Sequence, residues 1–347
     1  MKKLISFLIA AIFALTLYSC SDDQDTHTND SIEDSFENFE SYDESLEASE
    51  EESSCEDSEE CSTAIETEAV SDVFADSKFQ NYEHLNYVAL GDSIARGYGL
   101  KDSANGCYPA LLSKALSKVL PNTSVNYTNY ALDGLTTEGL VKLLSDGCEA
   151  VDGADLITVS IGANNLLGPF ISVAEKHMAE FVDSPNNITK EDLSSSTVIN
   201  SLKAIQEELE SDAFASVMKN GISKLDTELV SIISELKRRA PDAVIVVMTV
   251  YSPYHGIDLS LPYLELYFDL GSLSDKWVSE LDTEIRRITE ENECILVETY
   301  DAFETTRGLV NASLSLLPLN VSFDPHPNQK GHAMLSNLHL NAISAVK

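Results

Sequence analysis

Basic side chains are scarce in this sequence. Its 22 Lys and Arg residues stand against 58 Asp and Glu residues, which gives a formal net charge of -36 at pH 7. Proteins that bind nucleic acids neutralise phosphates with clustered Lys and Arg, so this composition disfavours a nucleic-acid partner. The same negative field repels anionic ligands at long range and favours neutral substrates.

Cysteine is also infrequent, with six residues whose spacing matches no zinc site. Cys55 and Cys61 are near enough in sequence to close a small loop, or they pair with another chain. We expect Cys107, Cys148 and Cys294 to be buried free thiols. A bridge between Cys107 and Cys148 is disfavoured because the predicted elements place them at opposite edges of the sheet, beyond the reach of a disulfide.

Long hydrophobic runs are limited to residues 4–17, which follow two lysines. This run is too short to span a bilayer comfortably and is typical of a secretory signal peptide, here residues 1–19. It leads through a Leu-Tyr-Ser tripeptide into Cys20, and this pattern resembles a bacterial lipobox. Lipidated Cys20 would anchor the mature chain at the outer face of the bacterial cell membrane. The alternative is a plain secretory signal in which Cys20 has no role.

Residues 20–80 consist mainly of Asp, Glu, Ser and Thr and carry more than half of the net charge of -36. Such a segment buries too little apolar surface to offset the entropy lost on ordering. We therefore predict a disordered acidic tether between Cys20 and the globular part. The alternative is that the acid run binds cations.

The remaining residues, 81–347, are sufficient for one domain with a large core. Runs that are apolar on both faces alternate in this region with amphipathic helical patterns, which is typical of a parallel sheet covered on each side. We predict a three-layer α/β/α sandwich with about five parallel strands. The expected strands are residues 87–90, 124–130, 155–161, 243–251 and 294–300, and the expected helices are residues 108–120, 136–144 and 221–239.

Two segments of this domain are long enough to shape a substrate site. Residues 166–212 form an insertion whose apolar positions suggest two or more short helices. They follow a predicted strand, so they form either a lid or substrate wall, or a unit packed elsewhere on the surface. Residues 251–267 are rich in tyrosine and leave the end of another strand, which makes them the better candidate for contacting an apolar or sugar substrate.

One hydroxyl group, that of Ser93, stands where the first predicted strand ends. Gly91 and Asp92 terminate the strand, and ligands in open α/β sheets bind outside the carboxyl ends of the strands. A serine hydroxyl needs a base within hydrogen-bond reach to become a nucleophile. The candidate base is His326, which lies between two prolines and two residues after Asp324.

Four sequence blocks carry this pattern: Gly91-Asp92-Ser93, a loop that ends at Gly134, Gly162-Ala163-Asn164, and Asp324-Pro325-His326-Pro327. Together they resemble the SGNH/GDSL hydrolase superfamily, whose blocks are a GDS serine, a glycine, a G-x-N asparagine and a D-x-x-H-P histidine in the same order. The resemblance covers most of the region after the tether. It implies a flavodoxin-like SGNH hydrolase fold, activity on acyl esters and no cofactor.

The resemblance also implies a role for each residue. Ser93 is the expected nucleophile, and His326 is the expected base that later returns the proton to the leaving alkoxide. The expected oxyanion hole comprises the backbone N–H groups of Ser93 and Gly134 and the side-chain amide of Asn164. Other polar residues have expected structural roles: Asp92 in the turn beneath Ser93, Asn129 as a loop anchor, Asn165 without a role in the chemistry, and His332 and His339 either on a helix surface or in packing.

The position of Asp324 departs from the family pattern, in which the acid stands three residues before the histidine. Phe323 occupies that place here. A loop can still bring the Asp324 carboxylate to the imidazole of His326. Otherwise a backbone carbonyl orients the ring, and Asp324 is a turn residue before a proline.

These observations predict a serine-dependent carboxylic ester hydrolase that acts outside the cytoplasm. The expected substrates are neutral acyl esters, either lipids or O-acylated glycans, and a monomer is the default. The alternative is a catalytically inactive surface glycan-binding protein on the same scaffold, supported only by the spacing of Asp324. A metal-dependent phosphoesterase is disfavoured because no paired His and Asp ligands accompany Asp92 and Asp324.

Overall fold

The computed structural model describes residue 74 and residues 77–182, 196–261, 266–316, 319–322, 324–344 and 346. The predicted signal peptide, Cys20 and most of the predicted tether, including Cys55 and Cys61, lie outside the described residues. No helix within the described residues is long and apolar enough to cross a membrane.

The centre of the molecule is a parallel sheet of five strands. In spatial order these are β2 (Ser124–Asn129), β1 (His84–Gly91), β3 (Leu156–Ser160), β4 (Val244–Met248) and β7 (Ile295–Val297). The chain builds outward from β1 in both directions, so the strand order reverses between β1 and β3. This arrangement confirms the predicted α/β fold with five parallel strands.

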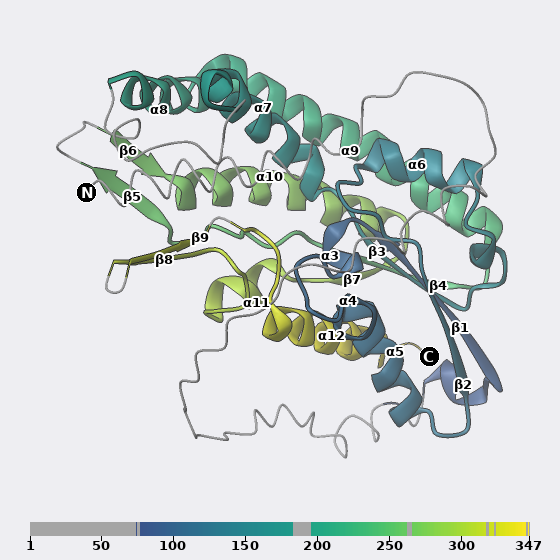
Figure 1. Cartoon of the computed structure of the whole chain (residues 1–347). Helices are drawn as coiled ribbons and strands as arrows, with labels where there is room; N and C mark the ends of the chain where they lie inside the picture. The colour runs from purple at the N-terminus through teal and green to yellow at the C-terminus, as the bar shows by residue number, and fades with distance from the viewer. Residues whose placement is uncertain are drawn as a thin grey trace, which may run out of the picture.

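Helices cover both faces of the sheet (Figure 1). Helices α5 (Tyr108–Val119) and α12 (Gln329–Ser344) pack on one face, and α6 (Thr137–Asp146), α9 (Asp212–Arg239) and α10 (Leu270–Glu291) pack on the other. Alternate residues of each strand point to opposite faces, so consecutive apolar residues feed two separate cores. All residues of β3 and β4 are buried, which explains why their sequences are continuous apolar runs.

The remaining elements complete the described part of the chain. They are α3 (Ser93–Arg96), α4 (Ser103–Gly106), α7 (Ala163–Val182), α8 (Ser196–Leu209), α11 (Tyr300–Thr305), the 3-10 turns η2 (Lys78–Asn81) and η3 (Glu149–Gly153), and the antiparallel hairpins β5 (Asp258–Leu261) with β6 (Leu266–Asp269) and β8 (Ser313–Leu316) with β9 (Leu319–Ser322).

The insertion contains two helices, α7 and α8, as expected, but α7 is longer than expected. It is a single helix of 20 residues that continues through Pro169. Proline lacks an N–H and leaves the carbonyl of Asn165 without its helical donor. That carbonyl faces α9 at Gly221, where an added Cβ would lie 2.7 Å from the Asn165 oxygen. Glycine at position 221 therefore allows α9 to approach α7 at this point.

The globular region begins earlier than residue 81. Phe74 and Phe79, which the sequence places in the acidic tether, are fully buried in the core beneath α5 and α12. The backbone N–H of Lys78 donates to the carbonyl of Val346, so this segment is fastened to the carboxyl-terminal end of the chain. These two aromatic residues stand within an acidic composition, and composition alone does not reveal their burial.

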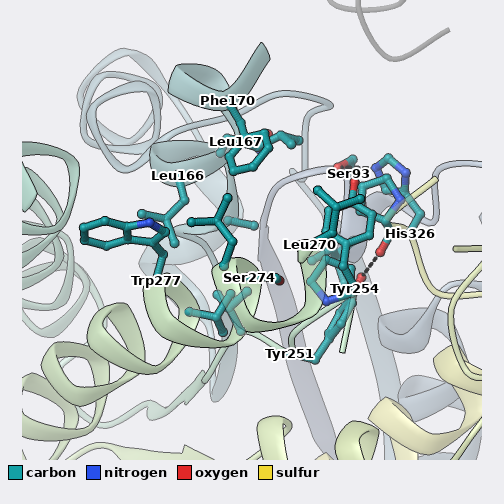
Figure 2. A pocket seen from close by; sticks show the side chains of 18 of the residues that line it. Ser93, Leu166, Leu167, Phe170, Tyr251, Tyr254, Leu270, Ser274, Trp277 and His326 are labelled. Atoms are coloured by element: carbon teal, nitrogen blue, oxygen red, sulfur yellow. Dashed lines mark hydrogen bonds between the residues drawn. The ribbon is translucent and has the colours of Figure 1, made fainter. Parts of the chain in front are cut away.

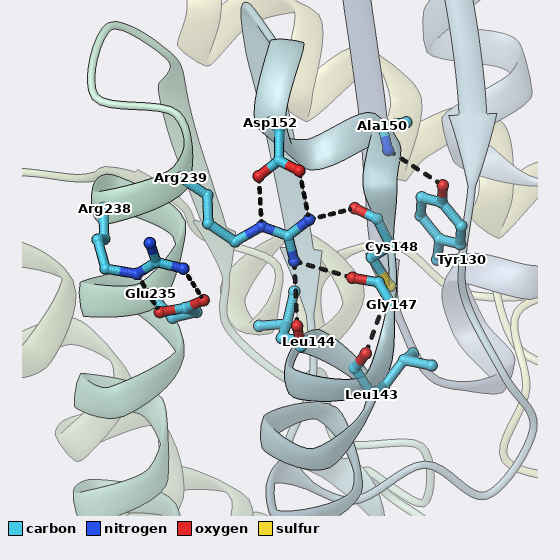
Figure 3. Close-up of polar contacts among 10 residues, drawn as sticks. All are labelled: Tyr130, Leu143, Leu144, Gly147, Cys148, Ala150, Asp152, Glu235, Arg238 and Arg239. Atoms are coloured by element: carbon cyan, nitrogen blue, oxygen red, sulfur yellow. Dashed lines mark hydrogen bonds and ion pairs between the residues drawn. The ribbon is translucent and has the colours of Figure 1, made fainter.

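The amino edge of the sheet is held by Arg239 at the end of α9 (Figure 3). Its guanidinium donates to the carbonyls of Leu144, Gly147 and Cys148 and to both carboxylate oxygens of Asp152. These carbonyls belong to the end of α6 and the turn after it, where helical partners are missing. One side chain thus satisfies the end of α6, and all five of its N–H donors are used.

Candidate active site

Ser93 lies at the carboxyl end of β1, where the strand order reverses. Gly91, two residues earlier, has φ +154°, and an added Cβ would lie 2.3 Å from the carbonyl oxygen of Ser160 on β3. Only glycine therefore allows β1 and β3 to approach this closely. Asp92 caps α3 by accepting a hydrogen bond from the N–H of Ile94 at 3.0 Å. In sheets of this order the crevice at the reversal is the usual ligand site, and Ser93 stands at its mouth.

The structure brings Ser93, His326 and Asp324 into one hydrogen-bonded chain. His326 Nε2 is 2.9 Å from Ser93 Oγ, and His326 Nδ1 is 2.6 Å from Asp324 Oδ1. The ring of Tyr98 lies against the imidazole with centroids 4.4 Å apart. This is the geometry of a nucleophile, a base and an orienting acid.

The spacing of Asp324 is accommodated by a tight turn. The same oxygen that contacts the imidazole, Oδ1, also accepts the backbone N–H of His326 at 3.1 Å, as in an Asx turn. The other oxygen accepts a hydrogen bond from the Asn311 amide at 2.8 Å. Asp324 is therefore a turn residue and also the partner of the imidazole, so the carboxylate contacts Nδ1 in the place where a backbone carbonyl was the alternative.

Two carboxylates flank Ser93 and have opposite electrostatic environments. Burial would raise the pKa of Asp324, but hydrogen bonds from the His326 ring and backbone and from Asn311 outweigh burial and lower it. Asp92 is fully buried, and desolvation raises its pKa to about 7 despite the hydrogen bond from Ile94. The carboxylate that touches the imidazole is thus ionised, and the one beneath the serine resists ionisation.

The expected oxyanion-hole residues come from three different segments. Asn164 lies in the first turn of α7, and its amide donates to the carbonyl of Leu135 at 3.0 Å, which leaves its second N–H for a ligand. Gly134 has φ +73°, and an added Cβ would meet nothing within 4 Å. Glycine is therefore favoured at position 134 by the positive φ angle, since a side chain there would meet no neighbouring atom. Ser93 begins α3, so its N–H has no helical acceptor.

The residues expected to have structural roles make local contacts. Asn129 donates to the carbonyl of Ala95 and accepts from Ala131 N–H. Asn165 exchanges hydrogen bonds with the backbone and hydroxyl of Thr137. His332 and His339 are fully buried, and burial lowers the pKa of each to about 4. These neutral imidazoles pack beneath α5, which confirms the structural prediction for them.

An apolar cavity extends from Ser93 and His326 into the body of the protein (Figure 2). Its volume is about 100 Å³. Helix α7, at the start of the insertion, contributes Leu166, Leu167 and Phe170, so this part of the insertion forms a wall of the cavity. The tyrosine-rich loop contributes Tyr251 and Tyr254, as expected. The remaining walls come from α9 and α10.

Sequence reasoning missed several residues at this site. Tyr98 lies close to Ser93 in the sequence and Asn311 precedes Asp324, but neither residue belongs to a motif that marks it as part of the site. Trp277 and Met218 occupy helical apolar positions that are indistinguishable from core positions in the sequence. Their role as cavity walls depends on the packing of α9 and α10 over the end of the sheet. Within the described part of the chain, no group of three or more His, Cys, Asp or Glu could hold a metal ion.

The fold and the site define an α/β protein of the SGNH hydrolase type. The model of the GDSL-like Lipase/Acylhydrolase family matches residues 89–334, which is most of the chain. The chain therefore belongs to this family, and membership supports hydrolysis of esters. No curated protein matches it significantly.

Solved structures share the fold at low sequence identity. A lipase from a goat rumen metagenome is 19% identical, with a TM-score of 0.52 and coverage of 76% of this chain and 99% of that one. An extracellular lipase from Streptomyces rimosus is 18% identical, with a TM-score of 0.46 and coverage of 74% and 99%. A putative GDSL-like lipase from Parabacteroides merdae is 14% identical, with a TM-score of 0.47 and coverage of 76% and 97%. At this identity the likeness concerns the fold alone.

Proposed function

We propose that this protein is a serine-dependent carboxylic ester hydrolase that acts on neutral acyl esters outside the cytoplasm. The observation that carries the proposal is the chain of contacts from Ser93 Oγ to His326 Nε2 at 2.9 Å and from His326 Nδ1 to Asp324 at 2.6 Å. This chain stands at the mouth of an apolar cavity. The family match supports the same class of reaction.

In the proposed mechanism Asp324 selects the tautomer of His326. Its ionised carboxylate accepts a hydrogen bond from Nδ1–H and keeps the proton on that nitrogen, which leaves the Nε2 lone pair directed at the Ser93 hydroxyl. Ser93 attacks the ester carbonyl while His326 takes its proton. His326 then donates that proton to the leaving alkoxide. Water deacylates Ser93 by the same steps in the second half of the cycle.

The tetrahedral intermediate carries a negative charge on the former carbonyl oxygen. We assign its stabilisation to the N–H groups of Ser93 and Gly134 and to the free amide hydrogen of Asn164. Neutral donors suit this task because they leave the charge of the imidazolium undisturbed. Each such donor typically contributes about 3 kcal/mol to the transition state.

The substrate is proposed to be an uncharged lipid ester or O-acylated glycan. The cavity wall beside the triad is built from Leu, Phe, Met, Trp and Tyr side chains, which favour an apolar acyl group. The net charge of -36 disfavours anionic esters. The spacing of Asp324 was the reason to consider an inactive binding protein, and its contact with His326 removes that reason.

The first experiment is hydrolysis of p-nitrophenyl acetate, butyrate, octanoate and palmitate by the purified full-length chain and by its Ser93→Ala variant. We expect activity in the parent and a loss of at least about 1000-fold in the variant, because the oxyanion hole alone retains little of the rate. Ser117→Ala, on the exposed face of α5, is the matched control and should retain full activity. Labelling by a serine-reactive phosphonate should occur in the parent and not in Ser93→Ala. An active, folded Ser93→Ala protein would contradict the proposal.

We further propose that Cys20 carries a lipid that anchors the protein to the outer face of a bacterial membrane. The support is the apolar run of residues 4–17 followed by Cys20. Expression in a bacterial host with and without Cys20→Ala, followed by membrane fractionation, tests this directly. The parent should remain with the membranes and the variant should not. Recovery of both proteins in the same fraction would refute the anchor and leave the hydrolase proposal intact.

A further inference from the structure

The cavity beside Ser93 is elongated along helix α10. Leu270, Ser274 and Trp277 line it from one face of α10, at the spacing that places residues on the same side of a helix. From Leu270 to Trp277 the helix advances about 10 Å. Figure 2 shows Ser93 and His326 at one side of the cavity and Trp277 at the opposite side, with Phe170 of α7 above. A chain attached to Ser93 would therefore extend along α10 toward Trp277.

Trp277 closes the far end of this path. Its side chain is buried, with a relative exposure of 3%. Lys276, its exposed neighbour, places Nζ 4.3 Å from the centroid of the indole ring. The indole thus separates the cavity from the surface on which Lys276 lies. Without it, nothing of comparable size on α10 would close the passage.

The indole of Trp277 is also an unusual choice for a core position. Its Nε1–H is buried and has no hydrogen-bond partner among the described residues. A buried donor without a partner destabilises the folded protein, and such groups in native proteins often mark functional sites. Phenylalanine or leucine would fill a core position without this penalty. The tryptophan is therefore better explained by its action on a ligand than by stability.

The size of the cavity limits what it can hold. A dry cavity of about 150 Å³ accommodates one benzene ring, six carbon atoms. The present cavity of about 100 Å³ is smaller and apolar on nearly all sides. It therefore suits an acyl chain of roughly four to six carbons, with little room for further methylenes.

We propose that this cavity is the acyl-chain subsite and that Trp277 sets its length, so that butyryl to hexanoyl esters are preferred over octanoyl and palmitoyl esters. The inference rests on the proposed ester hydrolase function and specifies the substrate class of the same site. Helix α7 of the insertion forms the opposite wall. The alcohol part of the substrate leaves the cavity mouth on the other side of Ser93.

The kinetic test compares kcat/KM for p-nitrophenyl hexanoate and octanoate in the full-length protein and three variants. We expect Trp277→Leu to raise the ratio of octanoate to hexanoate by about tenfold, since a misfitting methylene in an apolar pocket changes rates by this order. Leu273→Phe, which fills the cavity nearer to Ser93, should lower the ratio of hexanoate to acetate by about tenfold. Ser279→Ala, on the exposed side of α10, should change neither ratio. Unchanged ratios in both cavity variants would overturn the inference.

The chain offers a second readout that does not depend on turnover. Trp277 is its one tryptophan, so tryptophan fluorescence reports on this wall alone. In the Ser93→Ala background, hexanoate esters should change the emission in a saturable manner, and acetate esters at the same concentration should not. The Leu273→Phe substitution should abolish the hexanoate response. If hexanoate esters leave the emission of the Ser93→Ala protein unchanged, the assignment of the cavity as the acyl-chain subsite is contradicted. This readout does not require a cavity variant to fold.

The two proposals fail in different ways. If the parent protein hydrolyses none of the esters and is not labelled by the phosphonate, the proposed function is wrong. If it hydrolyses esters through Ser93 but prefers octanoate or palmitate, the hydrolase proposal stands and the subsite assignment is wrong.

Discussion

The two edges of the sheet use buried polar groups in opposite ways. At the amino edge Arg239 is almost buried, with an exposure of 8%, and every donor of its guanidinium has a partner. At the carboxyl edge Asp92 Oδ2 and Trp277 Nε1 are buried without partners among the described residues.

This difference indicates that the buried polar groups at the amino edge contribute to stability and that those at the carboxyl edge serve function. Saturated hydrogen bonding at Arg239 stabilises the fold, since a full set of partners offsets the desolvation cost of the guanidinium. Unpaired buried groups near Ser93 destabilise the fold, and such penalties concentrate at functional sites. Substitutions at the amino edge should therefore change the free energy of unfolding, and those at the carboxyl edge should change the rate.

The largest effect is expected at Asp324. Asp324→Asn would present an amide to His326 and favour the wrong tautomer, so kcat should fall by about 1000-fold, or about 4 kcal/mol in the barrier. The melting temperature should change little, because the turn at His326 N–H can still form. Asp146→Asn, an exposed acid of α6, is the control for loss of a single charge. Retention of more than a tenth of the parental kcat would refute an orienting role for Asp324.

Asp92 should produce the clearest pH dependence of stability. Its pKa is about 7 in the folded protein against 3.8 as the reference, so folding favours the protonated form. This contribution is fully present below about pH 4 and is lost as the pH rises through 7, with an upper limit of about 4 kcal/mol. Asp92→Asn keeps the cap acceptor and removes the titration.

Denaturant unfolding of the parent and Asp92→Asn at several pH values between 4 and 8 measures this difference. The free energy of unfolding of the variant, relative to the parent, should rise across that range. The pKa of Asp282 is also raised, to about 8. Asp282 is present in both proteins, so its contribution to the pH dependence cancels when the two free energies of unfolding are subtracted. A constant difference at all pH values would mean that Asp92 does not titrate in this window.

Arg239→Ala should lower the free energy of unfolding by about 2–4 kcal/mol, because three carbonyls lose a charged donor. At temperatures where the variant is folded, kcat/KM should equal that of the parent. Arg239→Lys should recover only part of the stability, since a lysine cannot reproduce the guanidinium fork. Equal stability of the alanine variant and the parent would show that water replaces these hydrogen bonds without loss.

The smallest effect is expected at Asn311, which contacts Asp324 and not the substrate. Asn311→Ala should reduce kcat by roughly fivefold, because the carboxylate keeps His326 but loses one hydrogen bond from an uncharged amide, worth about 1 kcal/mol or somewhat more. The acid limb of the pH–rate profile should move to higher pH, since Asn311 helps to lower the pKa of Asp324. A pH profile identical to that of the parent would limit Asn311 to a structural role.

Much of the fold was accessible from sequence because its signals are local. Continuous apolar runs predicted β3, β4 and β7, and helical periodicity predicted α5 and α6 within one or two residues at each end. The length of α7 was not accessible, since Pro169 normally ends a helix and here lies inside one. The sequence also did not reveal that the globular region includes Phe74 and Phe79, because the burial of a short segment depends on the residues against which it packs.

The sequence by itself determined the order of the strands and helices, the acidic character of the chain, and Ser93 and His326 as the residues to examine. These follow from spacing, composition and strand-end position, all of which are properties of neighbouring residues. Tertiary structure alone decided that Asp324 reaches the imidazole through a turn, that Asn311 steadies it, and that α7 and α10 enclose a cavity ending at Trp277. Each of these depends on contacts between segments distant in sequence, and the free energy of such contacts is set by the packing of the whole domain.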